Sequence, residues 1–236
     1  MVNRIVIASL ACVLVSSASA ANATPIISGN GELWSSTLAA ICTQVGSGAP
    51  CGGPTVAIDR HPAWMDAALT DPLAEWVSYG DTGYGGALLA PQNGHASNPT
   101  GHTPILEIQE SVTGLAGGAL NVRFWADDTL DVYFNGVLMQ AAVFGQDTCA
   151  NAPIGCEPNE FWDLNASLTG GIDVIRIIAY QVGTGTDTRS NPFGLLYSGR
   201  YADAPHVENV VPEPVTFALL GMGLAAAGVR RSRRRT

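Results

Sequence analysis

Lysine is absent from this chain of 236 residues, and basic residues are scarce outside its last few positions. All eleven basic residues are arginines, and five of them stand in the last seven positions. Between Ala21 and Val211 there are five arginines against nineteen acidic residues, which gives that part a net charge of −14. Such a charge repels nucleic acid and anionic lipid, and it favours solubility or binding of divalent cations. The composition therefore predicts no nucleic-acid partner.

Recognisable catalytic motifs are also lacking. The sequence contains no HExxH zinc motif, no serine in a GxSxG turn and no nucleophile paired with a base. We therefore expect a protein that is not an enzyme. A secreted hydrolase is a less favoured alternative, because the two carboxylates of a glycosidase carry no local motif.

One long apolar run stands near the C-terminus, at Val215 to Val229. As a helix it would reach roughly 22 Å, which is short of a hydrocarbon core of about 30 Å, so it spans only with local thinning or snorkelling. The arginines that follow would stay on the cytoplasmic side and place the body of the chain outside the inner membrane. They are Arg230, Arg231, Arg233, Arg234 and Arg235.

Pro212, Glu213 and Pro214 come directly before this apolar run. Each proline fixes its φ angle and removes a backbone donor, so the Glu213 peptide is held extended near the membrane surface. This order of motif, short hydrophobic helix and terminal arginine cluster resembles the PEP-CTERM sorting signal of Gram-negative bacteria. The resemblance implies recognition by an exosortase and removal of the tail. An ordinary C-terminal membrane anchor is the alternative.

The first 23 residues have the features of a secretory signal peptide. Arg4 precedes an apolar run from Ile5 to Val15, and small residues at positions 18–20 predict cleavage before Ala21. Residues 21–23 form a second, alternative site of small residues. Lipidation at Cys12 is a less favoured alternative. The sequence thus divides into a signal peptide (1–23), a body (24–201), a linker (202–211) and the sorting signal (212–236).

Four cysteines lie in the body of the chain. Cys42 and Cys51 bracket one Gly/Pro-containing loop, and Cys149 and Cys156 bracket another. Because an exported protein meets an oxidising environment, we expect two local disulfides among the three possible pairings. Zinc binding is the competing interpretation, but the spacings are not those of zinc sites.

Short apolar runs separated by glycine-rich turns predict an all-β fold with a single β-sandwich. One helical turn or two is expected at 62–69. The expected strand segments are 55–58, 75–79, 104–108, 120–126, 130–134, 172–182 and 194–197.

The most regular alternation lies between Leu120 and Phe134, and Asn135-Gly136 follows it as a type I′ turn. We expect a β-meander with one apolar face. Its opposite face would carry Arg123, Trp125, Asp131 and Tyr133 as one aromatic and charged cluster.

Residues 125–128 (WADD) and 131–136 (DVYFNG) resemble a meander of galactose-binding-like jelly rolls. Further segments resemble such domains in other PEP-CTERM proteins: 60–64, 75–78, 168–182 and 191–196. The resemblance covers about 150 residues and is loose, with Asp173 where asparagine is usual. It implies a jelly-roll-like sandwich rather than any activity.

Asp127 and Asp128 are the leading candidates for a metal site, because adjacent carboxylates are oxygen ligands of the kind that calcium takes. In flocculin-type lectins, which the pair resembles here, such aspartates hold calcium that binds sugar. We favour the plainer interpretation that both are turn residues and that Asp131 pairs with Arg123.

Several aromatic residues and histidines are weaker candidates. Trp125, Tyr133, Trp162 and Tyr84 have the chemistry to stack on sugar rings, but core positions are favoured for most of them. His95 and His102 lie in a polar loop that is expected to be solvated rather than metal-bound.

Taken with the two targeting segments, these features predict an exported, exosortase-sorted protein of the Gram-negative cell envelope or biofilm matrix. Its function is expected to be structural or adhesive, with the C-terminal helix in the inner membrane only transiently. The alternative is a calcium-dependent carbohydrate-binding module that binds exopolysaccharide or another glycan.

Overall fold

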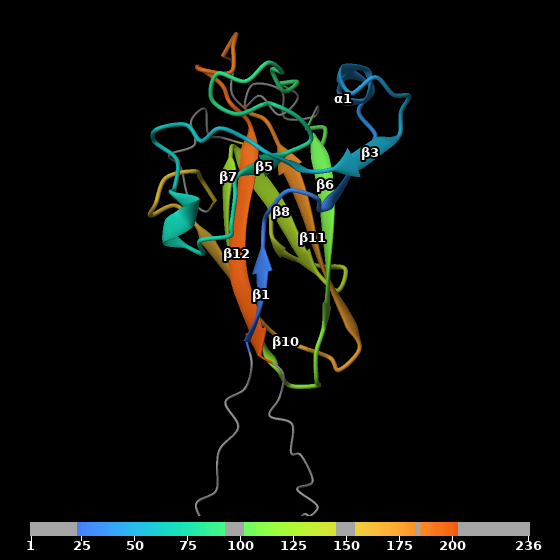
Figure 1. Cartoon of the computed structure of the whole chain (residues 1–236). Coiled ribbons are helices and arrows are strands. Elements are labelled where there is room, and N and C mark those ends of the chain that lie inside the picture. Colours follow the sequence, from blue (N-terminus) through green and yellow to red (C-terminus); the bar gives the residue numbers. More distant parts are fainter. Residues whose placement is uncertain (1–22, 93–101, 145–153, 183–184, 203–236) are drawn as a thin grey trace, which may run out of the picture. The chain divides into compact units, whose positions relative to one another are not determined.

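The computed structural model describes residues 23–92, 102–144, 154–182 and 185–202. These residues form two antiparallel sheets of six strands each, which pack face to face as a β-sandwich (Figure 1). The prediction of an all-β, jelly-roll-like sandwich is confirmed. The predicted signal peptide lies outside the described residues except for Ala23, and the linker and sorting signal lie outside them from residue 203 onward.

Sheet A has the strand order β10-β7-β12-β5-β4. β1 pairs with the C-terminal half of β12, along the same edge of β12 that pairs with β5. The strands of sheet A are β1 (Ala23–Ile27), β4 (Val56–Ala57), β5 (Val77–Ser78), β7 (Ala119–Asp127), β10 (Trp162–Ser167) and β12 (Gly194–Ala202).

Sheet B has the strand order β3-β2-β6-β11-β8-β9. Its strands are β2 (Leu33–Ser36), β3 (Cys51–Pro54), β6 (Leu106–Thr113), β8 (Thr129–Phe134), β9 (Val137–Gln140) and β11 (Ile172–Tyr180).

The main core fills the space between the two sheets. In β7 the alternating residues Leu120, Val122 and Phe124 are at most 2% exposed, because the pleat turns every second side chain inward. Ile108 of β6 and Ile177 of β11 are buried in the same cluster from the opposite sheet. The predicted alternation therefore identifies the buried face correctly.

A second apolar cluster lies outside sheet A, on the face turned away from the core. Trp64 and Trp76 pack there with ring centroids 4.2 Å apart and ring planes tilted by 34°. Trp125 and Leu196 of the sheet are buried against them. The Trp76 indole donates a hydrogen bond to the backbone oxygen of Met65 at 2.8 Å, which fixes the covering segment. The chain between β4 and β5 is thus held onto sheet A by aromatic packing.

The β8–β9 hairpin turns at Asn135 and Gly136, whose φ angles of 50° and 78° are both in the left-handed region. This is the predicted type I′ turn. The predicted pairing of the two strands before this turn, β7 and β8, is wrong. β7 belongs to sheet A and β8 to sheet B, so the chain crosses the sandwich between them instead of turning back as a hairpin. Both strands turn apolar side chains to the same core, so their alternation does not distinguish pairing from facing.

Helices are short among the described residues. α1 (Ala39–Gln44) lies beside β3 (Figure 1), and a 3₁₀ turn at Ala67–Leu69 falls inside the segment expected to be helical. No helix of the described part is long and apolar enough to cross a membrane.

The Cys42–Cys51 disulfide is present and joins α1 to β3. Cys156 is fully buried and disulfide-bonded, but Cys149 lies outside the described residues. The second predicted pairing therefore stays a prediction.

Candidate functional site

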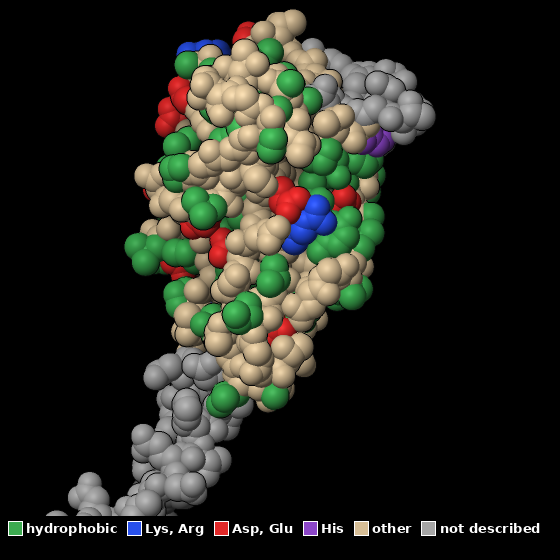
Figure 2. All heavy atoms as spheres, turned by 90° about the vertical axis from the view of Figure 1, so that its right-hand side faces the viewer, with side chains coloured by type: hydrophobic (Ala, Val, Ile, Leu, Met, Phe, Trp, Pro, Cys, Tyr) green, Lys and Arg blue, Asp and Glu red, His purple; other side chains and the backbone are tan. Residues whose placement is uncertain are grey.

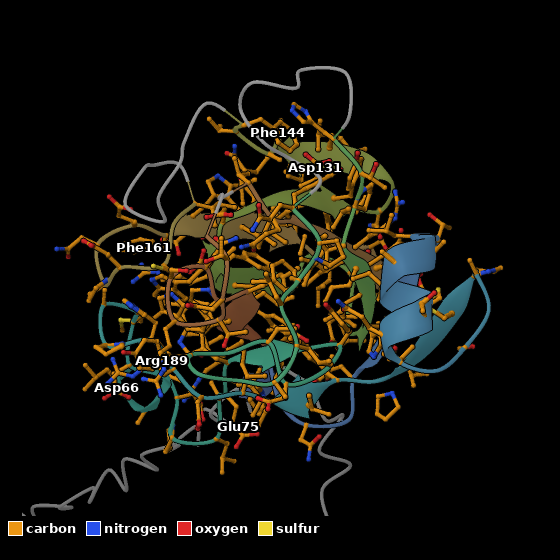
Figure 3. The ribbon with its side chains drawn as sticks, turned by 90° about the horizontal axis from the view of Figure 1, so that it is seen from above. Asp66, Glu75, Asp131, Phe144, Phe161 and Arg189 are labelled. Atoms are coloured by element: carbon orange, nitrogen blue, oxygen red, sulfur yellow. A yellow bond between two sulfur atoms is a disulfide. The ribbon has the colours of Figure 1, made fainter. Side chains whose placement is uncertain are left out.

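The four residues predicted to share one face lie on two faces. Arg123 and Trp125 belong to β7 of sheet A, whereas Asp131 and Tyr133 belong to β8 of sheet B. Arg123 contacts Phe161. In the view from above, Phe161 and Asp131 lie well apart from each other (Figure 3). The predicted cluster is therefore wrong, because it assumed that β7 and β8 were neighbours in one sheet.

Asp131 and Tyr133 make their contacts with residues on the sheet B side of the sandwich. Asp131 accepts hydrogen bonds from the Tyr180 hydroxyl at 2.8 Å and the Ala142 backbone N–H at 2.7 Å. The Tyr133 ring lies 5.1 Å from the guanidinium carbon of Arg176. Figure 2 shows this side of the molecule, where basic side chains are few. The expected Asp131–Arg123 pair does not form, because Arg123 binds Asp163 instead.

Asp127 and Asp128 are buried where the chain leaves β7, with exposed fractions of 6% and 2%. Asp127 accepts a hydrogen bond from the Trp64 indole at 2.8 Å, and Asp128 accepts one from the Val182 backbone N–H at 2.5 Å. Burial raises the pKa of Asp127 well above its usual value, and the adjacent Asp128 carboxyl raises it further.

This pair does not fit calcium as the structure places it. Calcium takes six to eight oxygen ligands, whereas both carboxyls are buried and one oxygen of each already accepts a hydrogen bond, from Trp64 and from Val182. The described residues contain no group of three or more His, Cys, Asp or Glu side chains suited to a metal ion. Asp127 instead fixes the Trp64 segment to sheet A, and Asp128 binds the backbone at Val182.

A cleft of about 640 Å³ opens on the outer side of sheet A. Its floor consists of outward side chains from three neighbouring strands, β10, β7 and β12. Strand register aligns them in two rows, Asp163–Arg123–Ser198 and Asn165–Asn121–Arg200. Met65, Leu69 and Pro158 contribute apolar groups to its walls. The cleft is thus polar along its floor and apolar along its sides.

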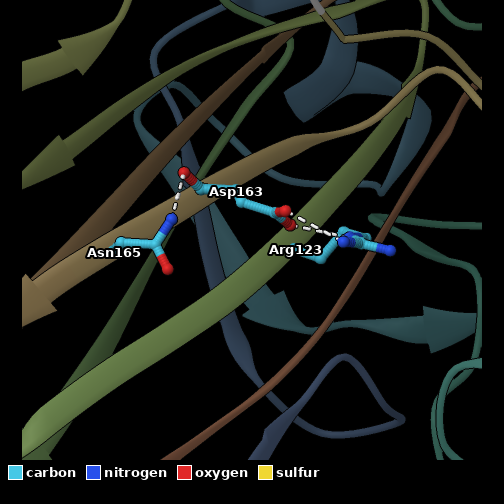
Figure 4. A network of polar contacts seen from close by, with 3 residues as sticks. All are labelled: Arg123, Asp163 and Asn165. Carbon is cyan, nitrogen blue, oxygen red and sulfur yellow. Dashed lines mark hydrogen bonds and ion pairs between the residues drawn. The ribbon is translucent and has the colours of Figure 1, made fainter.

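Arg123 and Asp163 form a two-pronged ion pair at the centre of the floor (Figure 4). The Arg123 Nε and Nη2 atoms lie 2.6 and 2.9 Å from the two Asp163 carboxylate oxygens. The guanidinium carbon also lies 3.5 Å from the centroid of the Phe161 ring. Two hydrogen bonds and a ring contact hold the planar guanidinium in one orientation, so this part of the floor is preorganised.

Trp125 lies beside this ion pair and is 1% exposed. Its indole Nε1 atom is buried and has no hydrogen-bond acceptor among the described residues, although the residue forms part of the cleft lining. An unpaired buried donor costs roughly 1–3 kcal/mol. A ligand or water that reached this atom would remove that cost.

Of the residues predicted to bind a ligand, only Arg123 and Trp125 are found among the described residues that line this cleft. Sequence reasoning missed Asn121, Asp163, Asn165 and Arg200. Asp163 and Asn165 alternate with apolar residues along β10, and that alternation is the signal that identifies outward positions. No feature of the local sequence indicates that β10 and β12 pair with β7 on either side.

The aromatic candidates are mostly packing residues. Trp125 is too buried to stack on a sugar ring, Trp162 packs against Phe124 with centroids 6.0 Å apart, and Tyr84 lies 5.4 Å from the Arg189 guanidinium carbon. His102 stacks on Phe144 at 3.5 Å, and His95 lies outside the described residues.

Comparison with known families identifies the C-terminal segment. Residues 210–235 match the family model of the PEP-CTERM protein-sorting motif. This match includes Pro212, Glu213, Pro214 and the arginine cluster, as expected. It indicates an exported protein that is sorted through this motif. No curated protein matches the chain.

Comparison with solved structures finds similar β-domains at low similarity. A family 35 carbohydrate-binding module from Clostridium thermocellum is 10% identical, with a TM-score of 0.34, and the match covers 77% of this chain and 99% of that one. A CBM35 from Paenibacillus barcinonensis is 12% identical, with a TM-score of 0.30, and the match covers 75% of this chain and 97% of that one. Similarities of this size carry no argument about what the present chain binds.

Proposed function

We propose that the chain is an exosortase substrate of the Gram-negative cell envelope, and that its β-sandwich has a non-enzymatic, structural or adhesive role at the cell surface or in the extracellular matrix. The match of residues 210–235 to the PEP-CTERM motif is the observation that carries this proposal. The inner membrane is a transient partner, through the segment 215–229, until the tail is removed.

The chemistry of the cleft supports a role without catalysis. Asp163 is the one carboxylate among its described lining residues, and both of its oxygens accept hydrogen bonds from Arg123. Glycoside hydrolysis requires two carboxyl groups that face each other across the substrate. The described lining thus offers glycoside cleavage no second carboxyl group, which supports the proposal of a non-enzymatic role.

Carbohydrate binding is the second candidate function, and the polar cleft on sheet A favours it. The calcium-dependent form of this candidate predicts that calcium raises the melting temperature and that Asp127→Asn with Asp128→Asn abolishes the increase. The buried, hydrogen-bonded positions of the two aspartates give the calcium requirement no support.

The sorting proposal is tested by expressing the full chain in matched hosts with and without an exosortase. Mass spectrometry should show the tail removed only where the enzyme is present. Glu213→Ala should block removal, whereas Glu208→Ala, a matched acidic position five residues earlier in the chain, should not. Recovery of intact Met1 to Thr236 as the mature form in the exosortase-positive host would overturn the proposal.

A further inference from the structure

We propose that the cleft on the outer side of sheet A binds an uncharged polysaccharide through the side chains of β7, β10 and β12, without calcium. The inference deepens the proposed adhesive role and rests on it, because it names the partner class and the residues that hold it. Four properties of the cleft lead to this ligand class.

The first property is that the cleft offers side chains rather than backbone. β7 forms its central floor and pairs with β10 on one side and β12 on the other. The backbone groups of β7 are therefore used within the sheet, and a peptide strand has no ladder to extend at this position. We therefore expect recognition through the two rows of outward side chains.

The second property is that the charges are already compensated. Arg123 binds Asp163, and Arg200 has Asp71 at 3.8 Å. Asp66 and Glu157 are each adjacent in the chain to a residue that lines the cleft, Met65 and Pro158, and they add negative charge near it. Because this rim and the acidic body repel polyanions, an acidic polymer is disfavoured.

The third property is unused hydrogen-bonding capacity of both kinds. The side chains of Asn121 and Ser198 form no hydrogen bond with any other described residue, and an amide or hydroxyl both donates and accepts. The Trp125 indole Nε1 atom also has no partner in the described chain, but it is buried, so a ligand reaches it only if the lining around it moves. Sugar hydroxyls also donate and accept, so they match this mixture better than a purely accepting anion does.

The fourth property is the apolar wall beside the polar floor. Met65, Leu69 and Pro158 line the cleft, and Leu69 is 77% exposed. A sugar ring presents hydroxyl groups at its edge and C–H groups on its faces, so it meets both kinds of surface at once. Small-ligand sites commonly combine apolar lining with a few placed polar groups.

The test uses the full-length chain in detergent micelles at about 0.15 M salt, where screening shortens long-range charge effects to roughly 8 Å. Biolayer interferometry measures binding to immobilised dextran, galactomannan, xyloglucan and laminarin, which are uncharged. Dextran sulfate and alginate serve as the anionic probes. Each measurement is repeated with EDTA.

The expected result is binding to at least one uncharged polysaccharide, stronger than binding to either anionic probe and unchanged by EDTA. Asn121→Ala combined with Ser198→Ala should weaken it by roughly tenfold, because two direct contacts are lost. Neither side chain bonds to another described residue, so folding should be preserved. Arg176→Ala on sheet B is the matched control and should leave binding unchanged.

Four results would overturn the inference: no binding to any of the four uncharged polysaccharides, loss of binding in EDTA, equal loss in Arg176→Ala, or full binding by the cleft variant. Normal tail removal together with any of these would leave the sorting proposal intact. A retained tail together with cleft-dependent glycan binding would instead overturn the sorting proposal alone.

Discussion

Each outer face of the sandwich carries an arginine that binds a carboxylate and packs on an aromatic ring. On sheet A, Arg123 binds Asp163 at 2.6 Å and lies over Phe161; on sheet B, Arg176 binds Glu107 at 2.7 Å and lies over Tyr133. The two arginine side chains are 42% and 40% exposed. An ion pair of this kind is therefore not in itself a binding site.

The difference between the two faces lies in what surrounds the ion pair. On sheet A, the Trp64–Trp76 cluster holds a covering segment whose residues Met65 and Leu69 form a wall of the cleft. Arg176 is not among the residues that line this cleft. The two faces thus share a similar ion pair, and the sheet A site differs by the second apolar cluster, which positions a wall of its cleft.

The largest expected effect comes from removing that cluster's central ring. Trp64→Ala deletes a side chain that is 1% exposed, packs on Trp76 and donates to buried Asp127, so it should lower the free energy of unfolding by roughly 3–5 kcal/mol. Tyr133→Ala on sheet B removes a half-buried ring and should cost only about 1 kcal/mol. Urea denaturation measures both. Equal losses would contradict the unequal roles of the two faces.

A smaller effect is expected from the disulfide on the sheet B side. Replacing Cys42 and Cys51 by alanine opens a loop with a sequence separation of 9 and should cost roughly 2–3 kcal/mol. Because this loop joins α1 to β3, away from the cleft strands, glycan binding should be unchanged in the folded variant. A variant that stays folded but loses binding would show that the two faces are coupled.

The smallest effect concerns pH on the open face. The hydrogen bond from Arg176 holds the pKa of Glu107 below its usual 4.5 despite partial burial. A lowered carboxyl pKa stabilises the folded state above about pH 4.5, and that stabilisation disappears as pH falls through the folded-state pKa. Between pH 6 and 3 the wild type should lose roughly 0.2–1 kcal/mol more than Glu107→Gln. If the urea midpoints of wild type and Glu107→Gln fall by the same amount between pH 6 and 3, the pair contributes nothing.

The sequence was sufficient to predict the sandwich, the inward residues of β7 and β8, and the turn at Asn135-Gly136. These features depend on local alternation and on φ angles that few residues adopt, so a single segment carries them. The α1 helix was missed, because its six residues are too few to show a helical period.

The site was harder to predict, because strand pairing is a long-range property. Arg123 and Trp125 were chosen for their outward positions, but alternation does not tell which strand lies beside β7. The partners Asp163 and Arg200 stand 40 and 77 positions later in the chain. Trp125 was placed on the outward face of β7, and nothing in β7 shows that the Trp64 segment folds over that face.

The most direct test of the cleft assignment observes the indole N–H signals of the five tryptophans by nitrogen-15 NMR during titration. Three of them, Trp34, Trp64 and Trp76, already donate hydrogen bonds within the protein, whereas Trp125 has no acceptor in the described chain. Oligosaccharides of the uncharged glycan that binds should shift the Trp125 signal most. A Trp125 signal that stays fixed while the ligand saturates the protein would contradict the account.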